Sequence, residues 1–148
     1  MFLTFFLLFL SFGSLSNKIT PPNPDFIFLY ISSFEFTVSP LNPIIVSGFA
    51  YGVDIYAHQI AMDCGLQTIG VLAHGLNQIY PKTHKKYMAK MEQNGGFLTE
   101  FWSSSNPDKE NFIKRNRIVA GISEATIVIE SAERGGSLVT ANLANDYN

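Results

Sequence analysis

The sequence predicts an α/β protein of three layers, in which a parallel sheet is covered by helices on both faces. Two observations support this prediction. From residue 44 onward, short apolar segments rich in β-branched residues alternate with longer amphipathic segments. Buried strands that are separated by helices of about ten or more residues are typical of βαβ units, in which neighbouring strands run parallel.

The expected elements follow one another along the chain, with glycine or asparagine at several of their ends. We expect strands at Ile44–Ser47, Gln67–Ala73, Phe97–Glu100 and Thr126–Glu130. We expect helices at Gly52–Cys64, Thr83–Gln93, Lys109–Ile122 and Gly136–Tyr147. Gly65 is expected to end the first of these helices, and Asn94, Gly95 and Gly96 to end the second.

Length and composition narrow the class of protein. A chain of 148 residues with 47% hydrophobic residues suffices for one domain with a core. The net charge of −2 means that any nucleic-acid binding has to rely on local basic patches. A single cysteine, Cys64, excludes an internal disulfide and fits a reducing compartment. His58, His74 and His84 lack metal-ligand spacing, so we expect no metal site. We also expect no cofactor.

The composition changes sharply near residue 43. Residues 1–43 hold nine of the thirteen phenylalanines but only three charged residues, which indicates an apolar leader (1–43) before a domain at 44–148. The apolar run at residues 1–12 is shorter than the about 20 residues that span a bilayer. Three interpretations of the leader stay open: an artefact of the gene boundary or reading frame, a membrane or export element, and an irregular apolar edge of the domain.

Glycines and polar residues follow the expected strands, at the edge where parallel sheets bind ligands. After the first strand come Ser47, Gly48, Tyr51, Gly52 and Asp54. After the last come Gly135, Gly136 and Ser137, which open a helix carrying Thr140. A glycine turn that leads into a helix suits an anion, because backbone N–H groups and the helix dipole converge there. The turns match neither the P-loop nor the dinucleotide-binding pattern.

The helix at 109–122 carries the basic residues of the candidate site. On a helical wheel, Lys114 and Arg117 lie on the open side, whereas Arg115 and Asn116 fall inside an apolar arc that also holds Ile113. One interpretation pairs Arg115 with Glu100 or Glu130 and bonds Asn116 to a loop backbone. The other has Lys114, Arg115 and Arg117 hold phosphates while Asn116 braces the neighbouring turn. The two interpretations are compatible, because a buried charge or amide needs a partner in either case.

Other polar and aromatic residues have two interpretations each. Asp54 is either a charge favoured by the helix dipole or a ligand-site group. His58 is expected to bond Asp54 or a loop backbone, with a phosphate contact as the alternative. We expect Lys85, Lys86 and Lys90 to form a solvated face, and Trp102 to pack at the end of the sheet, with base stacking as its alternative.

Four motifs carry a resemblance to a known family. Residues 47–54 (SGFAYGVD), 75–81 (GLNQIYP), 115–121 (RNRIVAG) and 135–141 (GGSLVTA) resemble successive signatures of the DNA-processing protein A family, DprA/Smf. The resemblance implies a Rossmann-like domain that binds single-stranded DNA and loads the RecA recombinase during natural transformation. It implies a mediator rather than an enzyme, a homodimer, and a cytoplasmic location, although the apolar N-terminus leaves membrane association open.

The chain also departs from the family pattern. Tyr51 stands where the family usually has an arginine associated with DNA contact, and Gly135 stands where many members have serine. Residues 1–43 do not match the family's first strand, and its final strand is not matched either, so we expect an incomplete domain with unpaired sheet edges. Two alternatives to DNA binding are a nucleotide-binding or phosphoribohydrolase-type enzyme on a related scaffold, and a fragment without function. The first would need a Pro-Gly-Gly-x-Gly-Thr turn, which residues 132–137 lack.

Overall fold

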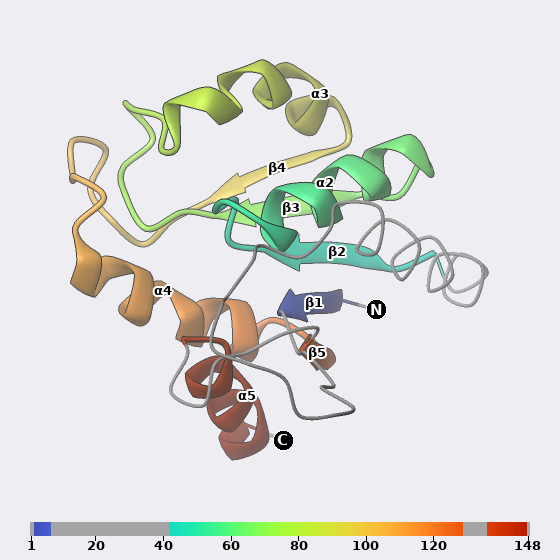
Figure 1. Ribbon diagram of the computed structural model, residues 1–148, viewed down its shortest axis with the longest axis vertical. Helices are drawn as coiled ribbons and strands as arrows, with labels where there is room; N and C mark the ends of the chain where they lie inside the picture. Colours follow the sequence, from blue (N-terminus) through green and yellow to red (C-terminus); the bar gives the residue numbers. More distant parts are fainter. Residues whose placement is uncertain (1, 7–41, 129–135, 148) are drawn as a thin grey trace, which may run out of the picture.

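The computed structural model describes residues 2–6, 42–128 and 136–147. Within them, five parallel strands form one sheet in the order β4-β3-β2-β1-β5 (Figure 1). The strands are β1 (Phe2–Phe6), β2 (Ile44–Ser47), β3 (Thr68–Val71), β4 (Gly95–Leu98) and β5 (Ala125–Val128). The helices are α2 (Val53–Asp63), the 3₁₀ helix η2 (Lys82–Tyr87), α3 (Met88–Gln93), α4 (Lys109–Gly121) and α5 (Gly136–Tyr147). The predicted α/β class is confirmed.

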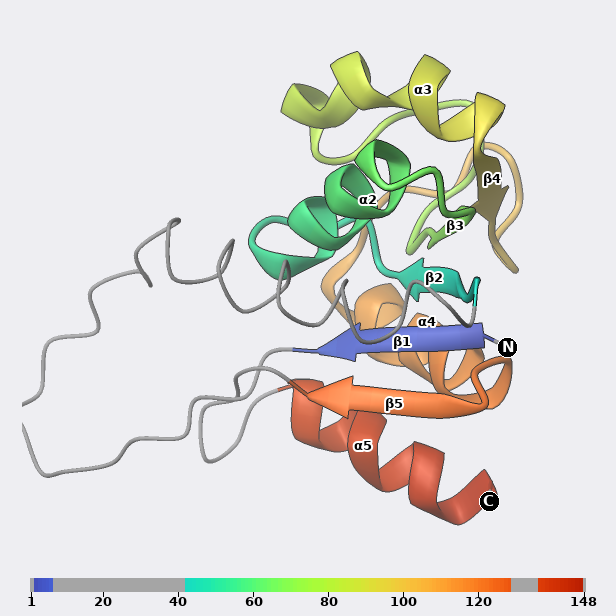
Figure 2. The same cartoon turned by 90° about the vertical axis from the view of Figure 1, so that its right-hand side faces the viewer.

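Helices cover both faces of the sheet. In Figures 1 and 2, α2 and α3 lie on one side of the strands, and α4 and α5 lie on the other. Side chains that alternate along β2 divide the core between these two faces. Ile45 packs with Ala57 and Ala61 of α2, whereas its neighbour Val46 packs with Val119 of α4. The fold therefore has the three layers that the sequence predicts.

The interior strand β1 was not expected. It lies between β2 and β5, with Phe2 opposite Ile44 and Phe6 opposite Val128. The expectation that residues 1–43 do not supply a first strand of the sheet was therefore wrong, because an apolar run too short for a bilayer has the length and composition of a strand paired on both sides. The other interpretations of the leader fall largely on residues outside the described ranges, and the boundary at residue 43 stays a prediction.

The segment expected to be one helix at 83–93 begins as a 3₁₀ helix and becomes α-helical only at Met88. Gly95 and Gly96, expected to end that helix, instead begin β4, two residues before the predicted strand. Both have φ near +154°, and a Cβ on Gly95 would lie 2.0 Å from the Thr68 carbonyl oxygen. Glycine is thus what lets the chain pass from helix directly into strand here.

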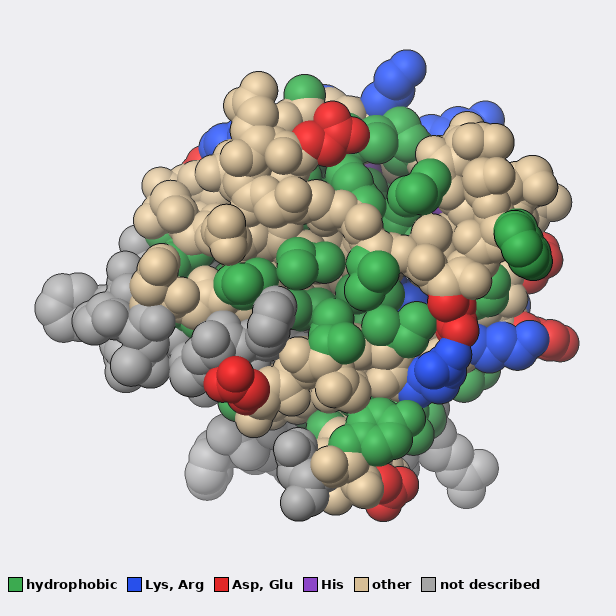
Figure 3. Space-filling model, turned by 180° about the vertical axis from the view of Figure 1, so that it is seen from behind, with side chains coloured by type: hydrophobic (Ala, Val, Ile, Leu, Met, Phe, Trp, Pro, Cys, Tyr) green, Lys and Arg blue, Asp and Glu red, His purple; other side chains and the backbone are tan. Residues whose placement is uncertain are grey.

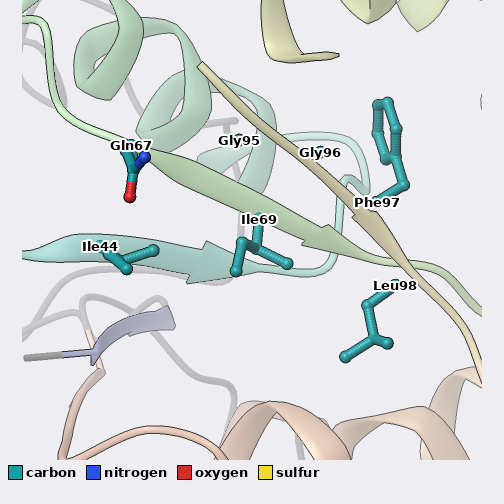
Figure 4. Close-up of a pocket in the computed structure, with 7 residues that line it drawn as sticks. All are labelled: Ile44, Gln67, Ile69, Gly95, Gly96, Phe97 and Leu98. Atoms are coloured by element: carbon teal, nitrogen blue, oxygen red, sulfur yellow. The ribbon is translucent and has the colours of Figure 1, made fainter. Parts of the chain in front are cut away.

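On the α4 side, no helix of the described ranges covers one stretch of the sheet. A groove of about 330 Å³ lies there, lined by Ile44, Gln67, Ile69, Gly95, Gly96, Phe97 and Leu98 (Figure 4). Seen from behind, the molecule shows a band of exposed hydrophobic side chains (Figure 3). None of the helices in the described ranges is long and apolar enough to cross a bilayer.

Candidate nucleic-acid interface

The turn after β2 is tightly built around Phe49. This residue has φ +57°, a left-handed conformation that costs a non-glycine residue about 1–2 kcal/mol, and it is 1% exposed. Its ring meets those of Phe97 at 5.1 Å and His84 at 5.3 Å between centroids. The Phe49 carbonyl accepts a 3.0 Å hydrogen bond from His84 Nδ1. Packing on all these sides offsets the backbone strain and holds the turn in one conformation.

Asp54 closes this turn from the first turn of α2. Its Oδ1 accepts a 2.7 Å hydrogen bond from the Ser47 hydroxyl, and its Oδ2 accepts one of 3.1 Å from the Ala50 N–H. The carboxylate is therefore more than a helix-start charge, because it ties the end of β2 to the start of α2. Ser47 is fully buried, so this hydroxyl is a structural element of the turn.

Arg115 reaches the same turn from α4. It is 3% exposed and donates hydrogen bonds to the carbonyls of Gly48, at 2.7 Å, and Val71. Gly48 directly follows β2, and Val71 is the last residue of β3. Burial lowers the pKa of Arg115, and the charge of Asp54 opposes that shift. A Cβ on Gly48 would lie 2.3 Å from Arg115 Nη1, so only glycine leaves room for the guanidinium.

The partners expected for Arg115 were therefore wrong in part. Glu100 pairs with Arg117 instead, and Glu130 lies outside the described residues. The wheel was right that Arg115 and Asn116 are buried while Lys114 and Arg117 face solvent. It was wrong about Ile113, which is 57% exposed. The surface of α4 thus presents Lys114, while Arg117 is half-exposed and engaged by Glu100.

Asn116 connects the Arg115 cluster to the start of α5. Its Oδ1 accepts a 3.1 Å hydrogen bond from Arg115 Nε. Its Nδ2 lies 3.9 Å from where a Cβ on Gly136 would stand. Asn116 is thus beside the glycine turn, although Gly135 and the rest of that turn lie outside the described residues.

The two remaining candidates on α5 differ in exposure. Ser137 is half-buried. Thr140 is fully buried, and its hydroxyl donates a 3.2 Å hydrogen bond to the Gly136 carbonyl within its own helix. Thr140 thus contributes to the α5 helix and its packing.

Tyr51 is the most exposed aromatic residue of the turn after β2, at 64%. Its ring stands edge-on to His84, 5.0 Å between centroids, and its hydroxyl accepts a 3.4 Å hydrogen bond from Thr83. Gly52, which follows it, has φ +85° and is the N-cap residue of α2. The turn therefore projects one aromatic ring into solvent on a rigid base.

The contacts and exposure of His58, Trp102 and the lysines differ in part from those expected. His58 hydrogen-bonds the Thr68 hydroxyl at 2.6 Å rather than Asp54 or a loop backbone, because α2 packs against β3. Trp102 is 87% exposed, so its expected packing role was wrong, and stacking on a base stays open. Lys85, Lys86 and Lys90 are exposed as expected. His74 and His84, which sequence reasoning did not select, are buried beside the turns because tertiary contacts surround them.

In the described part of the chain, no group of three or more His, Cys, Asp or Glu side chains is placed to hold a metal ion. The geometry instead unites the Ser47–Asp54 turn, α4 and the start of α5 through Arg115 and Asn116. Tyr51 and Lys114 are exposed on or beside this group of elements. An aromatic ring and a cation suit a base and a phosphate of single-stranded nucleic acid.

Comparison with known proteins agrees with this chemistry. The family model described as DNA recombination-mediator protein A matches residues 29–148. Protein Smf of Escherichia coli is 41% identical over 109 residues, covering 73% of this chain and 29% of its own. The curated relatives are matched over 25% to 36% of their length.

Two solved structures are also similar. DNA processing protein A from Streptococcus pneumoniae superposes with a TM-score of 0.71 at 30% identity, over 99% of this chain and 47% of its own. The Helicobacter pylori protein, whose structure concerns its single-stranded DNA binding mode, gives 0.76 at 27% identity, over 98% and 60%. The chain therefore belongs to the DNA recombination-mediator protein A family.

Proposed function

We propose that this chain binds single-stranded DNA through the turn at 47–54, the exposed face of α4 and the start of α5. The observation that carries the proposal is the hydrogen bond from Arg115 to the Gly48 carbonyl, which holds α4 against the turn. Lys114 would then neutralise a phosphate and Tyr51 would stack on a base. Gly135, Gly136 and Ser137 would supply backbone donors to a second phosphate.

Within this proposal the predicted site residues have two roles. Tyr51, Lys114, Arg117 and the turn at 135–137 contact the strand. Ser47, Gly48, Gly52, Asp54, Arg115, Asn116 and Thr140 hold these contacts in place, in keeping with the burial of five of them.

The test is a fluorescence-anisotropy titration of a labelled oligothymidylate. Lys114→Ala should weaken binding and lower the log–log salt slope by about 0.7, the value for one phosphate contact on a single strand. Lys90→Ala is the matched control, because Lys90 pairs with Asp63 at 2.5 Å on the other side of the sheet. A titration that does not respond to salt would contradict the proposal.

The proposal extends to the biological role of a mediator. We propose that the chain loads the RecA recombinase on single-stranded DNA in natural transformation, acts as a homodimer, and catalyses no reaction. Family membership supports this role. RecA filament formation on protein-coated strands tests the loading of RecA, and light scattering tests the homodimer. Release of free base from a nucleoside monophosphate would contradict the absence of catalysis.

A further inference from the structure

A second groove lies between the first turns of α2 and the 3₁₀ helix η2. It has a volume of about 320 Å³, at the lower end of the range of small-ligand sites. Tyr56 and Gln59 line it from α2, and Thr83, His84, Lys86 and Tyr87 line it from η2. Aromatic rings, an amide, a hydroxyl and an ammonium therefore face one space, a mixture that suits the base and phosphate of a nucleotide.

The groove is continuous with the turn that carries Tyr51. Thr83, on the groove wall, donates its hydroxyl hydrogen to the Tyr51 hydroxyl at 3.4 Å. His84, also on the wall, stands 5.0 Å from the Tyr51 ring and bonds the Phe49 carbonyl. A strand that stacks on Tyr51 thus passes directly beside the groove.

The charge of η2 favours an anion. Lys82, Lys85 and Lys86 are exposed, and the segment 81–91 holds no acidic residue. Both ion pairs found within the described residues engage other cations, Lys90 and Arg117. The Lys86 ammonium lies 4.8 Å from the centre of the Tyr87 ring. Burial lowers the pKa of His84, so the positive charge here comes from the lysines at neutral pH.

We propose that this groove is a subsite for a further nucleotide of the single strand bound at Tyr51, with its phosphate at Lys86 and its base against the tyrosine rings. The inference rests on the proposed function and adds a direction to it, because the strand would run from the turn after β2 across η2. Lys86, expected only as part of a solvated face, acquires a ligand in this arrangement.

The test compares the full chain with Lys86→Gln and Gln59→Glu, using oligothymidylates of about three and about twelve nucleotides, the longer being within the site sizes of single-strand binders. A strand of about twelve nucleotides extends past Tyr51 in both directions and so passes the groove, whereas a strand of about three can bind at the turn with at most one nucleotide beside it. Lys86→Gln should weaken its binding at least about threefold and lower the salt slope by about 0.7. Gln59→Glu should weaken it as well, because it adds a negative charge to the groove. Both variants should lose less affinity for the short strand than for the long one.

Lys90→Gln is the control and should bind both strands normally. Unchanged binding of the long strand by both groove variants would overturn the subsite and leave the proposed function standing. Equal losses of affinity for both strand lengths would also overturn the subsite, since Lys86 would then act through the turn or through the overall electrostatic field of the protein. Thymidine monophosphate that competes as well as the long strand would assign the groove to free nucleotides instead. Absence of oligonucleotide binding by the unchanged chain would overturn both proposals.

Discussion

Arg115 donates a 2.7 Å hydrogen bond to the carbonyl of Gly48, 67 residues away in the chain. The bond joins the helix that carries the basic residues to the turn that carries the exposed Tyr51. Both groups are buried, so the contact excludes water. The geometry of the candidate interface depends on this pair, and four predictions follow from it and its surroundings.

Gly48→Ala should destabilise the fold by about 1–3 kcal/mol, because the new methyl group would lie 2.3 Å from Arg115 Nη1 and 2.5 Å from Asp54 Oδ2. Chemical denaturation followed by circular dichroism measures the change. Gly121→Ala is the control: its Cβ would meet the Tyr147 ring at 3.4 Å, an ordinary contact, and a helical alanine gains up to about 1 kcal/mol over glycine. Equal effects of the two variants would contradict the prediction.

Arg115→Met should cost about 3–5 kcal/mol of unfolding free energy, because it leaves the Gly48 and Val71 carbonyls without a donor and Asp54 without its nearby cation. Arg117→Met should cost no more than about 1 kcal/mol, since its pair with Glu100 is half-exposed. The same denaturation experiment compares both. A larger loss for Arg117→Met would show that the buried cluster is not the stabilising one.

His58 should make stability depend on pH. Burial lowers its folded-state pKa from 6.5 to about 3, with the charges of Arg115 and His84 acting in the same direction. The unfolded chain therefore binds a proton more readily, so stability is complete above pH 6.5 and falls by up to about 1.4 kcal/mol per unit as pH drops toward 3. Unfolding free energies measured between pH 7 and about pH 5 test this.

A His58→Gln variant is the control for that measurement. It removes the titrating group, so its pH slope should be shallower than that of the unchanged chain, while His84 and the carboxylates keep their own contributions. Parallel slopes for the two proteins would show that His58 is not the group that titrates.

Tyr51→Arg should raise the affinity for single-stranded DNA and steepen the salt slope by about 0.7, because it adds a cation at an exposed position. Tyr51→Ala should weaken binding by about 1–3 kcal/mol through lost stacking, with the salt slope unchanged. Anisotropy titrations at several salt concentrations separate the two effects. If Tyr51→Ala binds as tightly as the unchanged chain, the ring does not stack on a base.

Much of the architecture was predictable because its causes are local. Helix α5 matches its predicted bounds, and β2 matches to the residue. The wheel divided Lys114 and Arg117 from Arg115 and Asn116 correctly, because the period of a helix is independent of what it packs against. The start of β4 was missed because Gly95 adopts a conformation that depends on its neighbour Thr68.

The sequence by itself determined the α/β class, the order of the elements from residue 44 onward, and the family through four motifs. Only the tertiary structure decided that Phe2–Phe6 is an interior strand between β2 and β5, and that Arg115 donates to carbonyls at the ends of β2 and β3 rather than to a glutamate. Hydrophobic periodicity is a property of neighbouring residues. The partner of a buried charge is instead whichever group the fold brings within about 3 Å, however distant along the chain.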